Sequence, residues 1–430
     1  MKSKISKVSA ILIACLILIG MLPANIAVAA GDIPIDEAYF PDANFRNFAL
    51  KGNWFDDCYC EHKIDADSNG FLSEAEIAPM IELNLDYQDI VDLTGIEYFT
   101  PIEYLYCRDP QLKTLDISKN TELRYLHCSN NLLTNLDLSQ NDELRELNCG
   151  NNPFSYPRQP IDTFNEDSLP YLWEFGCEGL GLTELDLTPC SGLRALNCSG
   201  NLLTSLDLSN NYELTKFDCG SNHFSDPHQP FETLSKKAAS CLKELGCEDL
   251  GLTEFDLSKY IGLRKLKCTG NQLTNLDISS NIALTELECS SNQLTGLDIS
   301  NNTVLEEFEC SGCSYLIHEL QYDPAGLPEG FDLNKASDWQ NCTVEGNILT
   351  FNDVNSPVKY TYDCGNGYKA EFSLCTDAKP APEITEEPTI EPQSTDAPQP
   401  TKEPSSTHEP KPDAKPETGN KSVMTVVTIF

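Results

Sequence analysis

Residues 65–76 carry oxygen-bearing side chains at a spacing that suits a hard metal cation. The candidate ligands are Asp65, Asp67, Asn69, the main-chain carbonyl of Phe71, Ser73 and Glu76. Ca²⁺ takes six to eight oxygen ligands from carboxylates, amides, carbonyl groups and water. We therefore expect this segment to hold Ca²⁺.

The spacing resembles the calcium loop of EF-hand proteins, in which position 6 is glycine and position 12 is a bidentate glutamate. Gly70 and Glu76 stand at these two positions. The resemblance implies a structural Ca²⁺ in the N-terminal part of the chain. The alternative is an acidic turn that caps a short helix, because the sequence has one such loop and residues 51–64 separate it from the amphipathic segment 41–50.

Aromatic residues form a second candidate site, at equivalent places in two successive sequence repeats. They are Tyr104, Tyr106, Tyr125 and His127. Aromatic side chains held on a rigid surface are suited to contacts with a protein or with sugar rings. We expect these residues to lie on a concave face and to bind a ligand; the alternative is a surface with incidental tyrosines.

Catalytic chemistry is not indicated by any group of residues in the sequence. The 6 histidines are scattered, and no nucleophile next to a base and no glycine-rich phosphate loop stands out. We therefore expect that the chain is not an enzyme.

A repeat carries these candidate residues and must position them. Its marker is a cysteine that recurs every 21 residues, with two intervals of 28, at Cys107, Cys128, Cys149, Cys177, Cys198, Cys219, Cys247, Cys268, Cys289 and Cys310. A fixed period of this length predicts a solenoid whose coils bury their apolar residues by stacking. Residues 125–128 and 135–138 alternate apolar and polar side chains, which predicts two strands per coil and hence two parallel sheets.

The repeat resembles that of bacterial leucine-rich repeat proteins, in the class whose 21-residue unit nests segments of 10 and 11 residues; the resemblance covers residues 80–316. It implies a β-rich solenoid of about eleven coils. The two 28-residue coils lie 70 residues apart within matching neighbours, which indicates a duplicated block of three coils. Their extra residues predict two helical insertions on the convex side, starting near residues 162 and 231.

Two repeated polar positions need an interpretation of their own. We expect the ten marker cysteines to be small buried free thiols, because neighbouring parallel strands place them in poor geometry for disulfides. Better disulfide candidates are Cys58, Cys60, Cys190, Cys241, Cys313, Cys342, Cys364 and Cys375. A row of aspartates is expected to accept hydrogen bonds from nearby Ser and Thr residues rather than to bind metal: Asp116, Asp137, Asp186, Asp207, Asp256, Asp277 and Asp298.

Composition divides the rest of the chain. Three early lysines, an apolar run and an Ala-Val-Ala sequence predict a secretory signal. Three short strands at 342–351, 358–363 and 368–375 predict a β cap. The expected segments are a signal peptide at 1–29, an N-terminal helical cap at 30–82, the repeat array at 83–318, a C-terminal β cap at 319–376, a Pro/Thr/Glu-rich disordered linker at 377–419 and a short apolar tail at 420–430.

Charge and export narrow the possible partners. The formal net charge of −38 disfavours nucleic acid. We expect a monomer that is secreted or displayed on the extracellular cell surface and binds an extracellular protein or glycan, in recognition or adhesion. Residues 415–419 resemble a sortase sorting motif with Lys in place of Leu, which raises the question of cell-wall attachment. The alternative function is a structural component of the cell envelope without a soluble ligand; ordered self-assembly would distinguish it.

Overall fold

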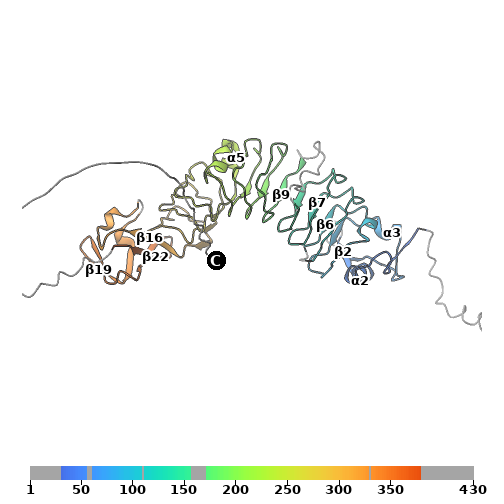
Figure 1. The fold of residues 1–430 in the computed structure, drawn as a ribbon, viewed down its shortest axis with the longest axis horizontal. Helices are drawn as coiled ribbons and strands as arrows, with labels where there is room; N and C mark the ends of the chain where they lie inside the picture. Colours follow the sequence, from blue (N-terminus) through green and yellow to red (C-terminus); the bar gives the residue numbers. More distant parts are fainter. Residues whose placement is uncertain (1–30, 56–60, 109–110, 156–170, 329–330, 379–430) are drawn as a thin grey trace, which may run out of the picture. The chain divides into compact units, whose positions relative to one another are not determined.

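The computed structural model describes residues 31–55, 61–108, 111–155, 171–328 and 331–378 (Figure 1). The predicted signal peptide, most of the predicted linker and the apolar tail lie outside these ranges. Within them, no helix combines the length and the apolar character needed to span a membrane.

A parallel sheet of 11 strands runs through the repeats in the order of the sequence (Figure 1). Its strands are β5 (Glu82–Asn84), β6 (Tyr104–Tyr106), β7 (Tyr125–His127), β8 (Glu146–Asn148), β9 (Glu174–Gly176), β10 (Ala195–Asn197), β11 (Lys216–Asp218), β12 (Glu244–Gly246), β13 (Lys265–Lys267), β14 (Glu286–Glu288) and β15 (Glu307–Glu309). Leu126 in β7 pairs with Leu105 in β6 and with Leu147 in β8, so equivalent residues stack from coil to coil. The predicted leucine-rich repeat solenoid is confirmed.

The prediction of a second parallel sheet is wrong for the described residues. Residues 135–138 form no strand, although Leu136 and Leu138 are both buried. The main chain turns here because the Asp137 carboxylate accepts a hydrogen bond from the Ser139 amide at 3.0 Å. Leu136 and Leu138 are therefore buried by a segment without regular secondary structure, which forms no second ladder of main-chain hydrogen bonds.

Buried asparagines join consecutive coils. The Asn201 amide donates hydrogen bonds to the carbonyl groups of Cys177 and Cys198, both at 2.9 Å, and its oxygen accepts one from the Leu182 amide at 3.0 Å. Equivalent hydrogen bonds are made by Asn131, Asn152, Asn222, Asn271 and Asn292. Each asparagine thus satisfies main-chain groups of two coils that would otherwise be buried without partners.

The ten marker cysteines are buried and free, as the repeat predicts. The predicted disulfides are not found among the described residues, because Cys190, Cys241, Cys313, Cys342, Cys364 and Cys375 are also free. Cys190 is packed inside the core, whereas Cys241 is exposed at the end of a surface helix, so these two thiols belong to different environments. Cys58 and Cys60 lie outside the described residues.

The row of aspartates is hydrogen-bonded as predicted. Each carboxylate accepts a hydrogen bond at 2.9–3.0 Å from the amide of the Ser or Thr two residues later, as Asp256 does from Ser258. The side-chain hydrogen bond from Ser258 lowers the pKa of Asp256. These carboxylates act as turn residues.

One of the two predicted helical insertions is described, as α4 (Gln229–Thr233) and α5 (Lys236–Cys241). The Gln229 side chain accepts a hydrogen bond from the Leu206 amide at 2.9 Å and donates one to the Leu206 carbonyl at 3.0 Å. The insertion therefore covers the coil segment opposite the strands. The helix expected near residue 162 lies outside the described residues.

A small helical region precedes the array. It consists of β1 (Ile33–Pro34), α2 (Ala43–Lys51), β2 (Asn53–Phe55), β3 (Glu61–Lys63), β4 (Phe71–Leu72) and α3 (Glu74–Ile77). Asp42 caps α2 by accepting hydrogen bonds from the amides of Asn44 and Phe45. The same carboxylate accepts a hydrogen bond from the Val91 amide at 3.0 Å, which fastens this region to the first coil.

Two smaller sheets follow the array; their strands pair antiparallel, except that β16 pairs with β22 in parallel. They are β16 (Cys313–Ile317), β17 (Gln321–Tyr322), β18 (Ala336–Gln340), β19 (Cys342–Glu345), β20 (Ile348–Phe351), β21 (Val358–Gly365) and β22 (Tyr368–Thr376). Residues 342–351, predicted as one strand, form the hairpin β19–β20, because Gly346 adopts a left-handed φ of 61°. The described residues also include the short 3₁₀ helices η1 (Ile96–Tyr98), η4 (Pro324–Gly326) and η5 (Leu333–Lys335).

Candidate functional site

The solvent-facing side of the 11-stranded sheet carries two side chains from each strand. In β7 the central Leu126 is fully buried, whereas Tyr125 and His127 on either side are partly exposed. The same alternation holds along most of the sheet; the exceptions are Gly176, Ala195 and Gly246, which are buried, and the central Phe308, which is partly exposed. We call this surface the outer face. It carries the aromatic residues predicted from the sequence and also a hollow that the sequence analysis did not predict.

The four predicted aromatic residues lie together on β6 and β7, and we call them the aromatic platform. The rings of Tyr104 and Tyr125 stack with centroids 4.2 Å apart and an angle of 7° between their planes. Tyr106 and His127 meet edge to face at 4.9 Å. The parallel register places these pairs side by side, so the ring orientations are fixed before any ligand arrives.

Electrostatics keep the hydroxyl groups of Tyr104 and Tyr106 protonated. Burial and the neighbouring Tyr125 raise the pKa of Tyr104 to about 12. Burial also raises the pKa of Tyr106. The His127 ring is held by Glu146, with 2.6 Å between Nε2 and the carboxylate oxygen. The platform thus offers neutral phenol groups and an oriented imidazole to a ligand.

Trp173 extends the platform, and the sequence analysis missed it. Its ring lies 6.1 Å from that of Tyr125, and the Arg194 guanidinium lies over it at 5.9 Å. Trp173 occupies the place just before a marker strand that Arg124 fills two coils earlier. This repeat position is the feature that could have revealed it.

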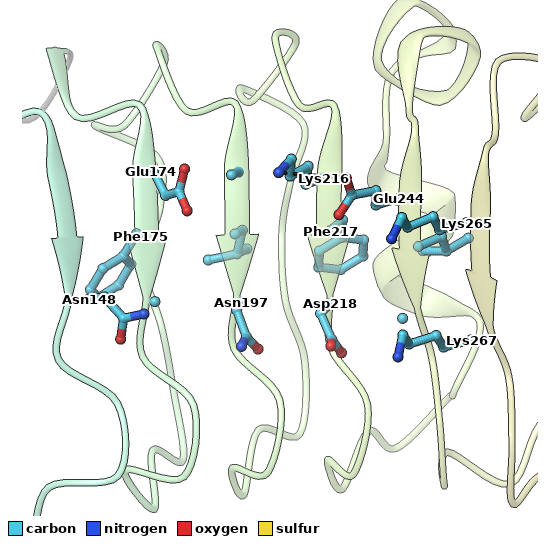
Figure 2. Close-up of a pocket in the computed structure, with 15 residues that line it drawn as sticks. Asn148, Glu174, Phe175, Asn197, Lys216, Phe217, Asp218, Glu244, Lys265 and Lys267 are labelled. Atoms are coloured by element: carbon cyan, nitrogen blue, oxygen red, sulfur yellow. Dashed lines mark ion pairs between the residues drawn. The ribbon is translucent and has the colours of Figure 1, made fainter. Parts of the chain in front are cut away.

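A hollow of about 300 Å³ interrupts the outer face over β8–β13 (Figure 2). Only three of the outward positions of the eleven strands hold a glycine or an alanine, and all three line this hollow: Gly176, Ala195 and Gly246. A Cβ atom at Gly246 would lie 2.5 Å from the Asp218 carboxylate carbon, so the approach of Asp218 requires glycine there. The duplication repeats this arrangement, since Gly176 and Gly246 are 70 residues apart.

Charged groups surround the hollow unevenly. Lys216 pairs with Glu244 at 3.5 Å, and Lys265 pairs with Glu286 at 2.6 Å. At the other end, burial raises the pKa of Glu174, and the negative charge of Glu146 adds to the effect.

The predicted calcium loop brings three carboxylates together. Oxygen atoms of Asp65, Asp67 and Glu76 all lie within 4.8 Å of one another. Asp65 is buried, and Gly70 has the left-handed φ of 81° that this tight loop requires. Three carboxylate oxygens at this spacing can share one cation.

Hydrogen bonds within the loop hold its carboxylates in place. The Asp65 carboxylate accepts hydrogen bonds from the amides of Asn69 and Gly70, both at 3.0 Å. Burial alone would raise the pKa of Glu76, but hydrogen bonds from Ser73, Ala66 and Asp67 leave it lowered. The loop follows β3, and its last three residues belong to the four-residue α3, so no helix precedes it as in EF-hand proteins.

Solved structures with a similar fold are leucine-rich repeat proteins. An internalin, inlF, of Listeria monocytogenes has a TM-score of 0.51 and 19% sequence identity over 67% of this chain and 80% of its own. The functional domain of InlJ from Listeria monocytogenes, described as including a cysteine ladder, has a TM-score of 0.36 and 22% identity over 80% of this chain and 99% of its own. An internalin C2 from the same species has a TM-score of 0.35 and 17% identity, over 65% and 97%. No family description and no curated protein matches the chain. This chain has the leucine-rich repeat fold.

Proposed function

We propose that this chain is an exported binding protein that recognises an extracellular protein through the outer face of its sheet. The observation that carries the proposal is the aromatic platform, in which Tyr104 and Tyr125 stack at 4.2 Å on a regular parallel sheet. Anchors that are already oriented lose little conformational entropy on binding. We propose a recognition role, without catalysis, at the extracellular surface or in the surrounding medium.

The composition of the platform supports a protein ligand. Tyrosine and tryptophan are enriched among the residues that contribute most to protein–protein binding. Tyr125 lies between Tyr104 and Trp173, so three large rings are available close together on the coils of β6, β7 and β9. Their apolar faces bind a partner's side chains, while the phenol groups donate hydrogen bonds at the rim.

The test selects peptide ligands for the full-length chain from a random library displayed on phage. The dissociation constants of selected peptides are then measured by calorimetry for the wild type and for the Tyr104→Ala/Tyr125→Ala variant. Since a dominant anchor contributes about 2 kcal/mol or more, we expect the double variant to bind at least about thirtyfold more weakly.

Tyr212→Ala is the matched control, because Tyr212 is an exposed tyrosine in a turn outside the strands. Equal losses in both variants would contradict the proposal. Specific binding to a glycan array, with no peptide ligand, would assign the face to carbohydrate. Ordered self-assembly without any ligand would favour the structural role in the cell envelope.

We also propose that Ca²⁺ stabilises the N-terminal region by binding the 65–76 loop. The support is the convergence of Asp65, Asp67 and Glu76 within 4.8 Å. Asn69, the Phe71 carbonyl and Ser73 are the proposed further ligands. Binding to the folded state alone adds free energy to folding, about 2.7 kcal/mol at a hundredfold excess over the dissociation constant.

Scanning calorimetry of the full chain tests the calcium proposal. We expect Ca²⁺ to raise the unfolding temperature and a chelator to reverse the rise. The Asp65→Ala/Glu76→Ala variant should show no rise, whereas Glu37→Ala, which removes an exposed carboxylate of the same region, should behave as the wild type. If the wild type melts identically with Ca²⁺ and with chelator, the segment is only a turn.

A further inference from the structure

We propose that the β8–β11 end of the hollow binds an arginine side chain of the partner protein. This inference deepens the proposed function, on which it rests, by assigning a second contact on the outer face and the chemistry of the group that fills it. The hollow lies beyond Trp173 from the aromatic platform, so one extended partner segment can reach both.

Space for a side chain comes from the small residues. Ala195 replaces the large outward residue that most strands carry at the same position, and it pairs with Glu174 on one side and Lys216 on the other. The volume of about 300 Å³ equals roughly that of ten water molecules in the liquid. One long side chain can therefore enter without displacing a strand.

Hydrogen-bond acceptors gather at the β8–β11 end. The Asn148 Oδ1 atom is buried and has no hydrogen-bond partner. Figure 2 shows the Glu174 side chain directed toward β10, the strand that carries Asn197, and Asp218 on the strand beyond. Burial raises the pKa values of both carboxyl groups, as expected where negative charge is held without enough compensation. A cation entering here would relieve that cost.

The lysines that line the hollow form ion pairs with glutamates of the sheet. Lys216, the one nearest to Glu174 in the register, pairs with Glu244 at 3.5 Å. Lys267 pairs with Glu288 at 2.7 Å, farther along the sheet. Lys216 lies on β11 itself, and the charges of Lys216 and Lys267 lower the pKa values of Glu174 and Asp218, respectively. Burial outweighs both effects, so negative charge is only partly compensated toward β9–β11.

Arginine fits this arrangement better than lysine. Asn148, Glu174 and Asp218 belong to three different strands, so their acceptors approach from different directions. A guanidinium group has five N–H donors in a planar fork, whereas an ammonium group is a compact point charge with three. The planar group can hydrogen-bond to several of these acceptors at once.

The test uses immobilised peptides of the sequence acetyl-Gly-Ser-Xaa-Ser-Gly-amide, with Xaa as arginine, lysine or citrulline. Surface plasmon resonance measures binding of the full-length chain at physiological salt. We expect binding to the arginine peptide, at least about fivefold weaker binding to the lysine peptide and none to the neutral citrulline peptide. If the chain binds the citrulline peptide as tightly as the arginine peptide, the proposal is overturned.

Variants locate the binding. Glu174→Gln and Asp218→Asn keep the side-chain shape, and each should weaken arginine-peptide binding about tenfold through loss of a charge-assisted hydrogen bond. Ala195→Leu fills the hollow and should abolish binding. The control Glu309→Gln removes an equal charge from the same face at β15 and should change nothing.

The outcomes separate this inference from the proposed function. Equal weakening by Glu309→Gln would show general attraction to an acidic protein and overturn the arginine site. Displacement of the arginine peptide by Ca²⁺ at a concentration too low to screen charge would assign the hollow to the cation instead. If binding of phage-selected ligands depends on Tyr104 and Tyr125 but not on Glu174 and Asp218, the aromatic platform is supported and the arginine site is contradicted. If it depends on Glu174 and Asp218 but not on the two tyrosines, the arginine site is supported and the platform is contradicted.

Discussion

Asp218 on the outer face is expected to lower the stability of the free protein while it contributes to the proposed binding of arginine. Its carboxylate accepts a hydrogen bond from the Gly220 amide at 3.0 Å, but no ion pair is found for it in the described structure. Burial raises its pKa. The folded chain therefore takes up a proton at Asp218 more readily than the unfolded chain does.

We expect Asp218→Asn to stabilise the free protein at pH 7, by about 1 kcal/mol or less. A carboxyl group whose pKa is raised on folding destabilises the protein at neutral pH. This penalty shrinks as pH falls through the pKa of the folded state and is gone below the pKa of the unfolded state. The advantage of the variant should therefore shrink on acidification and vanish near about pH 3, where the aspartate is protonated in both states. Thermal melts across this pH range check the sign.

Asp256→Asn provides a control with the opposite sign. The Ser258 hydrogen bonds lower the pKa of Asp256, so its contribution to stability is present at neutral pH and lost as pH falls through the folded pKa. This variant should lose stability at pH 7. A gain in both variants would mean that relief of the overall negative charge, rather than burial at Asp218, sets the effect.

At the scale of the elements, the asparagine ladder holds the turns of successive coils. Asn201→Ala leaves the carbonyl groups of Cys177 and Cys198 and the amide of Leu182 without their partners. Each unsatisfied buried group costs about 1–3 kcal/mol, so we expect a loss of about 3 kcal/mol or more in the free energy of unfolding. Urea unfolding measures it, and exposed Asn301→Ala should stay within about 0.5 kcal/mol of the wild type.

The cysteine row predicts a pattern of chemical labelling. Burial raises the pKa of Cys128 and Cys177 well above the usual thiol value, so these thiols are protonated and shielded. We expect iodoacetamide to label the exposed Cys241 in the native protein and the marker cysteines only after denaturation. Peptide mass spectrometry gives the labelled positions, and a Cys128–Cys149 disulfide would show this reading to be mistaken.

These elements also show where sequence reasoning succeeds. The marker leucines and cysteines predict the strands, because burial on stacked coils demands the same residue at the same position. The second sheet was predicted from the alternation of Leu136 and Leu138, which records burial and not main-chain pairing. The aromatic platform follows from register, whereas the hollow depends on Ala195 and Gly246, whose small size is informative only when the neighbouring strands are seen beside them.

For the whole molecule, the contact between the array and the strands after it rests on Gly296. The Tyr362 ring lies where a Cβ atom at Gly296 would come within 2.8 Å of it, and Tyr360 donates a hydrogen bond to the Thr295 carbonyl at 2.6 Å. The Ile299 amide also donates to the Cys364 carbonyl at 2.9 Å. The hairpin β21–β22 therefore packs directly on the last coils.

Gly296→Leu should separate this hairpin from the array, because Tyr362 is fully buried and has no room to retreat. We expect a loss of about 1–3 kcal/mol and faster limited proteolysis within residues 331–376, with the array cut no faster. Asn347→Ala, which changes an exposed side chain in the turn between β19 and β20, is the control for proteolysis. Uniform acceleration throughout the chain would mean that the array and these strands unfold as one unit.

The strand order of the large sheet has a mechanical consequence. Every strand from β6 to β14 pairs only with the strands of the coils before and after it, so tension applied to the two ends would detach coils from an end of the array one at a time. Each 21-residue coil releases roughly 70 Å of extended chain, and each 28-residue coil roughly 95 Å. A force–extension record of one molecule would then show the repeat lengths as a series of steps, with the longer steps marking the two coils that carry the insertions.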